Sequence, residues 1–530
     1  MATRLTAFAK FFITLLILGA IAGVGYVVLN KTSLGSSLKK KAEEAKQQTE
    51  ADKAKEEPKT GFNDDDNTIV VQLVSWGGYG PGLYFNEGAE PNTKSRFYTD
   101  YGFKVRFVLE NDLVNAMNAW IADEYDVAVQ TADAFPLYTG PADINSYKPK
   151  AFMQVDWSRG GDAIIVKRGI NTVNDLKGKK VVVAVPSPAQ TLLLTALEAA
   201  GLKYADITVV KTSDNITAAQ IFKSGDVDAA VVWSPDDQLA TKDVPGSKVL
   251  LTTKSESHVI ADIFFAKESY LNSHREMIAH FYEGWMKAVA ELKANPTNKD
   301  KAARYLADLN KLGVEDAMGM TEVVYWTNHG DNLNFFGMNP QYKGQKGEDL
   351  YTKMSKNFVM TGDAEKEAPA WRNVIWTSAI QDASDKLSGP QYGAEASKTF
   401  SAPTAEDKSA PAIANKPVSI NFASGKFQLD ENSKTIIDLQ FADISKSFAN
   451  SRVRIEGNTD NVGSAQSNQT LSQKRAQAVA DYLATQFKID RNRFIIIGNG
   501  PGKPVPGCEQ NQDDACKAKN RRTDFVLVAD

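Results

Sequence analysis

The chain has 530 residues, which is more than a single hydrophobic core usually serves, so we expect several domains. Hydrophobic residues make up 42% of the sequence and charged residues 24%, which excludes a chain that is disordered throughout. The formal net charge of −4 argues against a nucleic-acid-binding protein, because such proteins present a basic surface. The composition therefore favours a multidomain globular protein.

The N-terminus contains an uncharged apolar stretch, FFITLLILGAIAGVGYVVL, from Phe11 to Leu29. At about 1.5 Å per residue, a helix of this length can cross the hydrocarbon core of a bilayer. A cleaved signal peptide would have a shorter apolar region followed by a small-x-small cleavage site. Residues 1–30 are therefore predicted to be an uncleaved transmembrane signal anchor.

The segment after this stretch is polar. Residues 31–67 are rich in Ala, Lys, Glu and Gln and lack a sustained apolar heptad, which predicts a helix-prone, solvated tether rather than a coiled coil. Several lysines follow the apolar stretch, so the balance of lysine and arginine does not itself favour a cytoplasmic N-terminus. That orientation is inferred from the domains that follow.

Short apolar runs alternate with helical segments in the middle of the chain. The runs typical of strands are 69–74, 104–108, 125–129, 181–185, 207–210 and 229–233. Strands separated by helices predict an α/β domain over residues 68–400, with a parallel sheet covered on both faces. After about residue 265 the pattern becomes mainly helical. Residues 401–416, rich in Ala, Pro and Ser, are predicted to be a linker before a final domain, residues 417–530.

The final domain carries a long ordered motif. IEGNTDNVG runs from Ile455 to Gly463, NQTLSQKRAQAV follows from Asn468 to Val479, and Asn-Arg-Arg precedes the last strand at 520–522. This pattern resembles the OmpA-like peptidoglycan-binding family and implies a small α+β domain. Asn458 departs from the family, which often has histidine there, but the charged pair in the motif is intact.

The resemblance implies a peptidoglycan site formed by Asp460, Arg475, Asn468 and Thr459. Diaminopimelate in a peptidoglycan stem peptide carries both an ammonium and a carboxylate. Asp460 would receive the ammonium, and Arg475 would hold the carboxylate with two parallel hydrogen bonds. Two alternatives remain open: an internal salt bridge between Asp460 and Arg475, and a capping role for Asn468.

Four phrases in the middle domain resemble the periplasmic substrate-binding proteins of the sulfonate, taurine, nitrate and thiamine-precursor ABC-uptake group. They are VSWGGYG at 74–80, DAIIVK at 162–167, DLKGKKV at 175–181 and GDVDAAVVW at 225–233. The resemblance implies a two-lobed, type II-like periplasmic binding protein. The first lobe would be about 68–165 and 260–400, and the second about 166–259. Ligands of such folds lie where loops leave the strand ends, and the lobes close on them by a hinge.

The solute site is expected to include Trp76, Tyr79, Ser187, Gln190, Thr191, Trp233, Asp156 and Asp162. Trp76 and Tyr79 lie in a glycine-rich loop, where they would either stack on a ligand or pack between the lobes. Ser187, Gln190 and Thr191 open a helix whose free N–H groups and dipole favour an anion, unless Ser187 is simply its N-cap.

The two aspartates suggest a different ligand. Asp156 and Asp162 would suit a cationic or amine-bearing solute, or they would pair with Arg159. The sequence does not decide between these readings.

The only cysteines are Cys508 and Cys516. They are expected to form a disulfide in an oxidising compartment, the alternative being two free thiols. A zinc site is not expected, because no histidine lies near them. We find no Walker loop, no Gly-x-Ser-x-Gly elbow and no metal-ligand spacing among the histidines, so neither an enzyme nor a cofactor is predicted.

We therefore expect an inner-membrane-anchored periplasmic solute-binding protein that its OmpA-like domain tethers to peptidoglycan. It would serve uptake or sensing of a small solute, an anion being one candidate, with an ABC transporter permease or another membrane complex as a partner. The alternative is a structural or motor-associated envelope protein whose middle domain is a ligand-free spacer. The apolar stretch lacks an ionisable residue, which speaks against a motor stator.

Overall fold

The computed structural model describes residues 67–185, 187–420, 422 and 425–528, which fall in one compact unit. The predicted anchor at 1–30, and the tether at 31–67 apart from Asn67, lie outside the described residues. Among the helices of the described part, none combines the length and the hydrophobicity that a bilayer crossing requires.

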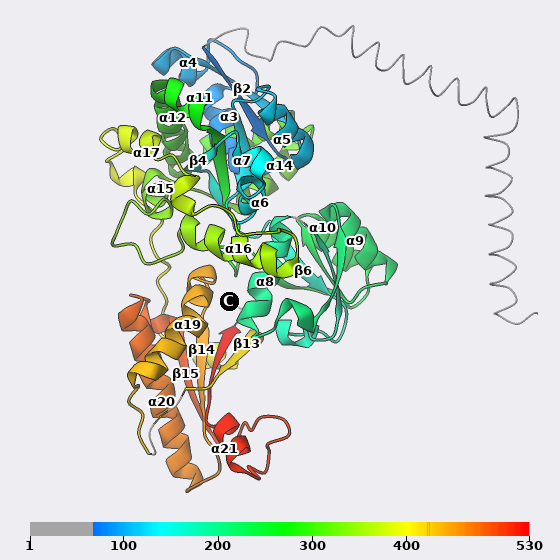
Figure 1. Cartoon of the computed structure of the whole chain (residues 1–530), viewed down its shortest axis with the longest axis vertical. Coiled ribbons are helices and arrows are strands. Elements are labelled where there is room, and N and C mark those ends of the chain that lie inside the picture. The colour runs from blue at the N-terminus through cyan, green and yellow to red at the C-terminus, as the bar shows by residue number, and fades with distance from the viewer. Residues whose placement is uncertain (1–66, 186, 421, 423–424, 529–530) are drawn as a thin grey trace, which may run out of the picture. The chain divides into compact units, whose positions relative to one another are not determined.

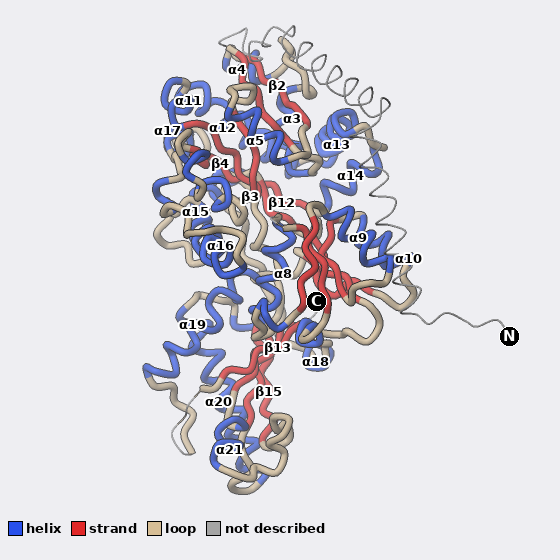
Figure 2. Tube along the Cα trace, turned by 45° about the vertical axis from the view of Figure 1, so that its right-hand side comes forward, coloured by secondary structure: helices blue, strands red, loops and turns tan. Residues whose placement is uncertain are grey.

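The first lobe is built on a five-stranded sheet of order β2-β1-β3-β11-β4 (Figures 1 and 2). Strand β1 pairs in parallel with β2 and β3, whereas β11 returns antiparallel between β3 and β4. The central strands are apolar and buried on both faces, as expected for a sheet covered by helices. The strands are β1 (Thr68–Leu73), β2 (Lys104–Leu109), β3 (Val127–Thr131), β4 (Pro149–Gln154) and β11 (Asp262–Lys267).

Helices from two separate parts of the chain cover this sheet. Those before β4 are η1 (Gly77–Tyr79), α3 (Gly80–Asn86), α4 (Arg96–Tyr101), α5 (Leu113–Ile121), α6 (Pro136–Thr139) and α7 (Ala142–Asn145). Those after β11 are α11 (Glu268–Ser273), α12 (Arg275–Ala294), α13 (Pro296–Asn310), α14 (Val314–Glu322), α15 (His329–Phe335), α16 (Gly347–Thr361), η4 (Trp371–Asn373), α17 (Ser378–Ala383) and η5 (Pro390–Tyr392). The predicted helical character after residue 265 is confirmed.

The second lobe has its own five-stranded sheet of order β10-β6-β9-β7-β8. Its strands are β6 (Asp162–Val166), β7 (Lys180–Ala184), β8 (Thr208–Thr212), β9 (Ala229–Trp233) and β10 (Lys248–Thr252). Its helices are η2 (Val173–Leu176), α8 (Pro188–Ala199), η3 (Tyr204–Asp206), α9 (Asn215–Ser224) and α10 (Asp236–Asp243). The boundary expected at residue 166 is wrong, because β6 pairs with β9 and β10 and so belongs to this lobe from Asp162 onward.

The chain crosses between the lobes before β6 and again before β11. Strand β5 (Asp156–Ser158) lies on the first crossing and pairs with β12 (Val324–Trp326). The hydroxyls of Ser158 and Thr253 lie 2.8 Å apart and join the two crossings. The predicted two-lobed α/β arrangement is confirmed. The expected parallel sheet is not, because β11 in the first sheet and β6 in the second run antiparallel to their neighbours.

The C-terminal domain has a four-stranded sheet of order β13-β16-β14-β15. Its elements are β13 (Ala412–Val418), α19 (Glu431–Ser447), β14 (Val453–Asn458), α20 (Ala465–Gln486), η6 (Arg491–Arg493), β15 (Phe494–Gly500), α21 (Asp514–Asn520) and β16 (Thr523–Val528). Helix α20 connects the parallel strands β14 and β15 and lies directly on them, as Figure 1 shows. A Cβ at Gly457 would come within 2.2 Å of the Ser472 carbonyl oxygen, so glycine permits this close packing.

The predicted linker is shorter than expected. A short helix, α18 (Ala405–Ser409), lies inside it, and β13 begins at Ala412 and pairs antiparallel with β16. Ile413, Ala414 and Val418 are buried in the sheet. The interruption by Pro411 and Pro417 concealed this strand, which tolerates proline because it lies at the sheet edge.

The apolar cores of the second lobe and of the C-terminal domain are continuous. Leu192 and Leu193 of α8 belong to the same buried cluster as Phe441 of α19 and Ile455 of β14. Asn174 adds polar contacts, because its side-chain amide donates to the Asn415 carbonyl at 2.8 Å and its side-chain oxygen accepts from the Asn415 N–H. The C-terminal domain is therefore docked on the second lobe.

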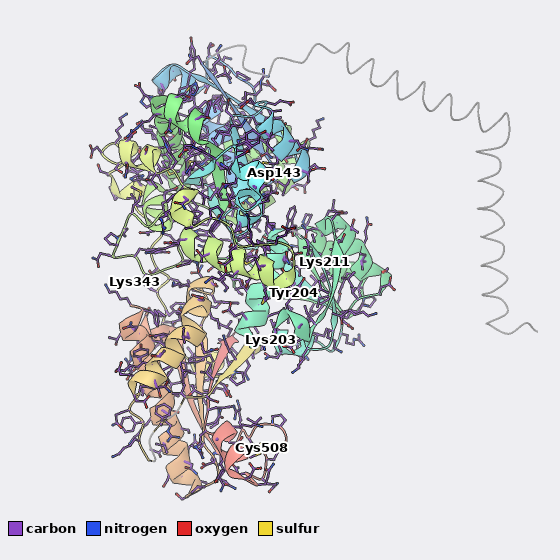
Figure 3. All side chains as sticks on the ribbon, viewed as in Figure 1. Asp143, Lys203, Tyr204, Lys211, Lys343 and Cys508 are labelled. Atoms are coloured by element: carbon purple, nitrogen blue, oxygen red, sulfur yellow. A yellow bond between two sulfur atoms is a disulfide. The ribbon has the colours of Figure 1, made fainter. Side chains whose placement is uncertain are left out.

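A disulfide joins Cys508, labelled in Figure 3, to Cys516 within α21. The loop that they close also has polar support. Asp513 caps α21 by accepting from the Cys516 N–H at 2.6 Å, and the side-chain amide of Asn520 donates to the Cys508 carbonyl at 2.9 Å.

We predict that the paired change Cys508→Ser and Cys516→Ser lowers the free energy of unfolding of the C-terminal domain by about 2–3 kcal/mol, because the short cross-linked loop restricts the unfolded chain. Calorimetry of the full chain, oxidised and reduced, measures this change. If reduction shifts the wild-type transition but leaves the double variant unaffected, the disulfide is responsible. An unchanged wild-type transition would contradict the prediction.

Candidate functional site

Four buried aspartates meet where the lobes join. Asp133 follows β3, Asp156 lies in β5 on the first crossing, Asp162 begins β6, and Asp262 begins β11 after the second crossing. Their exposed fractions are 0%, 1%, 5% and 7%, respectively. We refer to them as the acidic cluster. Two of them, Asp156 and Asp162, were expected from the sequence.

Neutral groups provide most of the hydrogen bonds to the acidic cluster. The Trp76 indole N–H donates to Asp156 at 3.1 Å, and the Tyr79 hydroxyl donates to Asp262 at 2.6 Å. The Ser158 hydroxyl donates to Asp162 at 2.8 Å. One oxygen of Asp156 is buried without a hydrogen-bond partner. The Thr191 and Thr131 hydroxyls lie toward the Asp133 carboxylate and lower its pKa, against the larger effect of burial.

Burial raises the pKa of every member of the acidic cluster. The pKa of Asp133 rises to about 7 because burial disfavours the charged form, and the nearby charge of Asp162 adds to the effect. The pKa of Asp162 rises to about 6, again chiefly through burial. Burial first, and then mutual repulsion, also raises the pKa of Asp156 and Asp262. The cluster is therefore partly protonated near neutral pH.

Arg159 does not neutralise this charge. Its guanidinium forms a two-point ion pair with Glu395, at 2.8 and 3.2 Å. The sequence-based alternative in which Arg159 pairs with Asp156 or Asp162 is therefore wrong. Among the described residues, no lysine or arginine forms an ion pair with a member of the acidic cluster.

The start of α8 reaches the same region. Ser187 is its N-cap, accepting from the Ala189 N–H at 3.2 Å, so the capping reading is correct. The Gln190 amide donates to Asp363 at 2.7 Å. The Thr191 hydroxyl is buried and lies toward Asp133, whose pKa it lowers through hydrogen bonding. All three side chains thus interact with the protein's own groups.

The predicted aromatic residues differ in their roles. Tyr79 is fully buried and stacks on Phe264 with ring centroids 6.2 Å apart, which favours the packing interpretation. The Trp76 ring lies against the first crossing, where a Cβ at Gly161 would come within 2.3 Å of it. Trp233 is 43% exposed, and its indole lies toward Asp162 and lowers that pKa.

Sequence reasoning missed Asp133 and Asp262. The strand predicted at 125–129 is β3 at Val127–Thr131, two residues later, so Asp133 follows a strand end that the prediction misplaced. Asp262 begins a buried apolar strand, β11, that was not assigned from the sequence. The usable signal was an aspartate directly next to a buried apolar run, the position where such folds bind ligands.

The second candidate site lies at one end of the C-terminal sheet. Asp460, in the loop after β14, pairs with Arg521 at 2.6 Å rather than with Arg475. The expected alternative of an internal Asp460–Arg475 salt bridge is therefore not what the structure contains. The Arg475 guanidinium lies 4.9 Å from the Phe422 ring centroid and donates to the Lys426 carbonyl at 3.2 Å.

Asn468 and Thr459 support this loop. The Asn468 amide donates to the carbonyls of Asp460 and Val462, at 3.3 and 3.0 Å. Asn468 lies within α20 and stabilises the loop after β14. The N-cap of α20 is Ser464 and not Asn468. Thr459 is buried and its hydroxyl has no hydrogen-bond partner.

Charge at this site favours an anionic group. Burial lowers the pKa of Arg475, Asp460 raises it, and Arg521 lowers it further. Two guanidinium groups thus act near one carboxylate, which leaves a net positive charge for a ligand carboxylate to balance. Sequence reasoning gave Arg521 no role, although it belongs to the quoted Asn-Arg-Arg motif.

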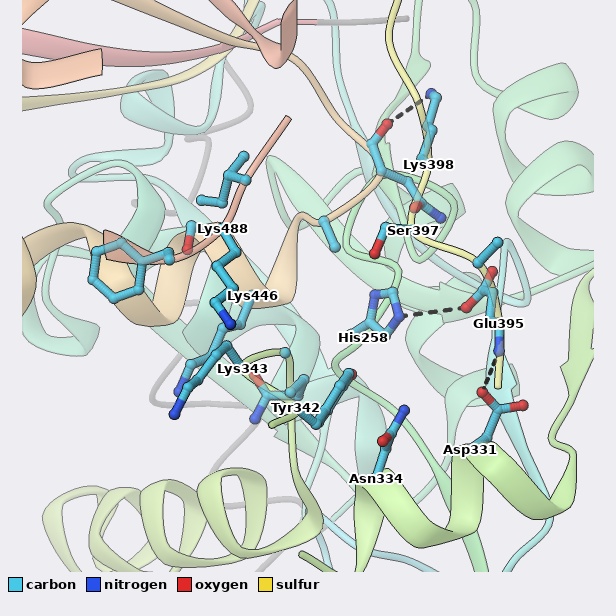
Figure 4. Close-up of a pocket in the computed structure, with 18 of the residues that line it drawn as sticks. His258, Asp331, Asn334, Tyr342, Lys343, Glu395, Ser397, Lys398, Lys446 and Lys488 are labelled. Atoms are coloured by element: carbon cyan, nitrogen blue, oxygen red, sulfur yellow. Dashed lines mark hydrogen bonds and ion pairs between the residues drawn. The ribbon is translucent and has the colours of Figure 1, made fainter. Parts of the chain in front are cut away.

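A further pocket of about 400 Å³ lies where the chain after η5 meets α19 and η6 (Figure 4). His258 and Glu395 lie in it with Nε2 and Oε2 3.6 Å apart, and the Glu395 N–H donates to Asp331 at 2.7 Å. Burial lowers the pKa of His258 to about 4, so the imidazole is neutral at pH 7. This network lies at the junction between the middle domain and the C-terminal domain.

We predict that Asp133→Asn stabilises the protein at pH 8 and not at pH 4. The folded-state pKa of Asp133, about 7, exceeds the unfolded value of about 3.9. The folded state therefore holds more protons between these values, and stability falls as pH rises through that window. At pH 8 the gain from the neutral amide is at most about 4 kcal/mol.

Calorimetry of wild type and Asp133→Asn at each pH measures this difference. Comparing the two proteins at the same pH cancels the titration of the histidines. The exposed Asp385 provides the matched control, Asp385→Asn, which should change little at either pH. Equal transition temperatures for wild type and Asp133→Asn at pH 8 would refute the proposed charge burial.

Comparisons with known proteins agree with this division of the chain. Residues 93–299 match the NMT1/THI5 like family, and residues 421–521 match the OmpA family. Over 130 residues the chain is 31% identical to outer membrane porin F of Pseudomonas aeruginosa, covering 24% of this chain and 36% of the porin. Over 221 residues it is 27% identical to a candidate aliphatic sulfonates-binding protein of Bacillus subtilis, covering 42% of this chain and 65% of that protein.

Among solved structures, the periplasmic aliphatic sulphonate binding protein SsuA from Escherichia coli aligns with a TM-score of 0.45 and 19% identity. The alignment covers 60% of this chain and 100% of that chain. The chain thus spans about a third of the porin and less than two thirds of the Bacillus protein. Its middle part is similar to the NMT1/THI5 like family, and its C-terminal part is similar to the OmpA family.

Proposed function

We propose that this protein is a periplasmic solute receptor that is anchored in the inner membrane and held to peptidoglycan by its C-terminal domain. The observation that carries the proposal is that both domains keep buried polar groups without partners at the strand ends. One carboxylate oxygen of Asp156 does so where the lobes join, and the Thr459 hydroxyl does so beside Asp460. Unsatisfied buried polar groups cost stability, so their presence favours a ligand-binding role.

The C-terminal site suits the diaminopimelate of a peptidoglycan stem peptide. Arg475 lies on α20, and its Nε donates to the Lys426 carbonyl. The two terminal nitrogens of the guanidinium group therefore remain for a ligand carboxylate. Asp460 exchanges its contact with Arg521 for the ligand ammonium, because that carboxylate is only partly enclosed by the exposed arginine. The OmpA family match at residues 421–521 supports this assignment.

The middle domain suits a receptor better than a spacer. Replacing buried charges by apolar side chains of similar size is often neutral or stabilising. A domain that served only as a spacer would therefore gain no stability from the acidic cluster. The cluster lies on the first crossing and on both lobes, where closure would enclose a small solute. The solute then passes to an ABC transporter permease or another membrane complex.

The membrane anchor is part of the same proposal and rests on the apolar stretch from Phe11 to Leu29. With the N-terminus in the cytoplasm, both folded domains lie in the periplasm. That compartment also permits the Cys508–Cys516 disulfide.

We predict that Arg475→Ala weakens binding of the full chain to purified, protein-free sacculi at least about tenfold, because a charge-assisted hydrogen bond contributes roughly 1.5–3 kcal/mol. Arg475→Lys should also weaken binding to sacculi, since the point charge of lysine cannot reproduce the two-point contact of arginine with a carboxylate. Co-sedimentation over a range of sacculus concentrations measures the affinity.

The matched control is Arg491→Ala, which removes an exposed arginine of the same domain. Circular dichroism checks that each variant is folded. If folded Arg475→Ala and Asp460→Asn both sediment like wild type, the domain does not hold the wall through this site.

For the anchor, we predict that the full chain stays with inner membranes after a high-salt wash, whereas deletion of residues 1–30 behind a cleavable signal releases it into the periplasm. Fractionation with immunodetection distinguishes the two forms. A soluble wild-type form that begins after residue 30 would reject the anchor.

A further inference from the structure

The pocket at the domain junction is separate from the acidic cluster. Its lining includes Trp157 of the first crossing and His258 of the second, whose rings meet edge to face with centroids 5.0 Å apart. Asp156, the neighbour of Trp157 in β5, belongs to the acidic cluster, and successive side chains of a strand point to opposite faces. The pocket and the acidic cluster therefore lie on opposite sides of the first crossing.

The size and walls of the pocket suit a small molecule. Its volume of about 400 Å³ falls in the range of roughly 300–1,000 Å³ that is usual for small-molecule sites. The walls come from the loop before α16, from the segment after η5, and from the ends of α19 and α20. The middle domain and the C-terminal domain therefore both contribute to it.

The carboxylates in the pocket are satisfied by the protein itself. Glu395 forms its two-point ion pair with Arg159, and Asp331 accepts from the Glu395 N–H at 2.7 Å. Asp490 accepts from the Phe400 N–H at 2.9 Å. A cationic ligand would have to displace these contacts, so the pocket does not favour a cation.

The lysines in the pocket are not balanced in the same way. Figure 4 shows Lys343, Lys446 and Lys488 gathered on one side of the pocket, away from Glu395. Lys446 pairs with Asp349 at 3.0 Å. Neither Lys343 nor Lys488 has an ion pair or a side-chain hydrogen bond with any residue that the structure describes. Like charges that gather without a counter-ion repel one another, so this side of the pocket favours an anion.

The rest of the lining suits hydroxyl groups. Gln154 is fully buried, and its Oε1 has no hydrogen-bond partner among the described residues. A buried acceptor without a partner costs stability, which a donor on a bound molecule recovers. A hydroxyl group both donates and accepts, so it also suits the other amide and hydroxyl side chains of the lining. These are Asn334, Asn339, Gln341, Gln345, Ser397 and Asn450.

We propose that this pocket binds a small hydroxylated organic anion, of the sugar acid or sugar phosphate class, whose carboxylate or phosphate group contacts Lys343 and Lys488. Its hydroxyl groups bond to the amide side chains of the lining. The site contains no member of the acidic cluster, so it is additional to the solute site between the lobes. Because two domains form its walls, a bound anion also stabilises the contact between them.

Isothermal titration calorimetry of the full chain in detergent, near neutral pH and at low salt, tests this assignment. Gluconate and glucose 6-phosphate are the two probes of the proposed class, and they distinguish a carboxylate from a phosphate. Glucose lacks the charge, hexanoate lacks the hydroxyls, and inorganic phosphate lacks the organic body. We expect at least one probe of the proposed class to bind at least about tenfold more tightly than these three.

The double variant Lys343→Gln with Lys488→Gln should weaken this binding at least about tenfold, because it removes both charged donors. Added salt should weaken binding to the wild type more than to the double variant, since exposed charges are screened. Both lysines lie free of contacts with the described residues, so the double variant is expected to fold, which its thermal transition checks. Lys356→Gln, which removes an exposed lysine of α16, is the matched control and should bind like wild type.

Three results would overturn the inference. Hexanoate or inorganic phosphate binding as tightly as the hydroxylated anions would reject the ligand class. Affinity that the double variant retains would place the binding elsewhere, for example between the lobes. A chain that binds neither gluconate nor glucose 6-phosphate would reject the site. Each of these results leaves the proposed receptor function standing, because that function rests on the other side of the first crossing.

Discussion

The structure of the middle domain is governed by negative charge that is buried between two lobes. Asp133, Asp156, Asp162 and Asp262 come from four separate segments, and all four are buried. Burying such groups costs free energy that apolar side chains would not cost. The surrounding neutral donors reduce this cost without removing it, and so the cluster is the feature that a ligand would stabilise most.

Helix α8 links the two halves of the molecule. Its first turn carries Thr191 toward the acidic cluster, while Leu192 and Leu193 join the apolar core that continues into the C-terminal domain. The C-terminal domain is thus fixed to the lobe that a hinge motion would displace. Adjacent residues of one short helix therefore contact the acidic cluster on one side and the core shared with the C-terminal domain on the other.

Local sequence patterns predicted much of the fold and less of the sites. Strands β7 and β9 and helix α20 were predictable because each is a long apolar or amphipathic run with clear end signals. Strand β13 was not, since its prolines resemble a linker and its pairing with β16 is formed by distant residues. The assignment of β6 to the second lobe likewise depends on which strands it pairs with.

The same distinction applies to the sites. The OmpA-like motif identified Asp460 and Arg475 directly, but the contact between Asp460 and Arg521 joins residues 61 positions apart. Asp133 and Asp262 had no motif of their own, because their importance comes from burial beside other carboxylates. Charge that accumulates from several segments is a property of tertiary structure, and periodicity along the chain does not reveal it.

The carboxyl titration of the ligand-free protein tests the central claim most directly. Selective ¹³C labelling of aspartate, with Asp133→Asn for assignment, lets NMR follow the Asp133 carboxyl between pH 3 and pH 9. The buried-charge account predicts a midpoint near 7 for the Asp133 resonance. A midpoint below about 4, the value of an exposed aspartate, would contradict it.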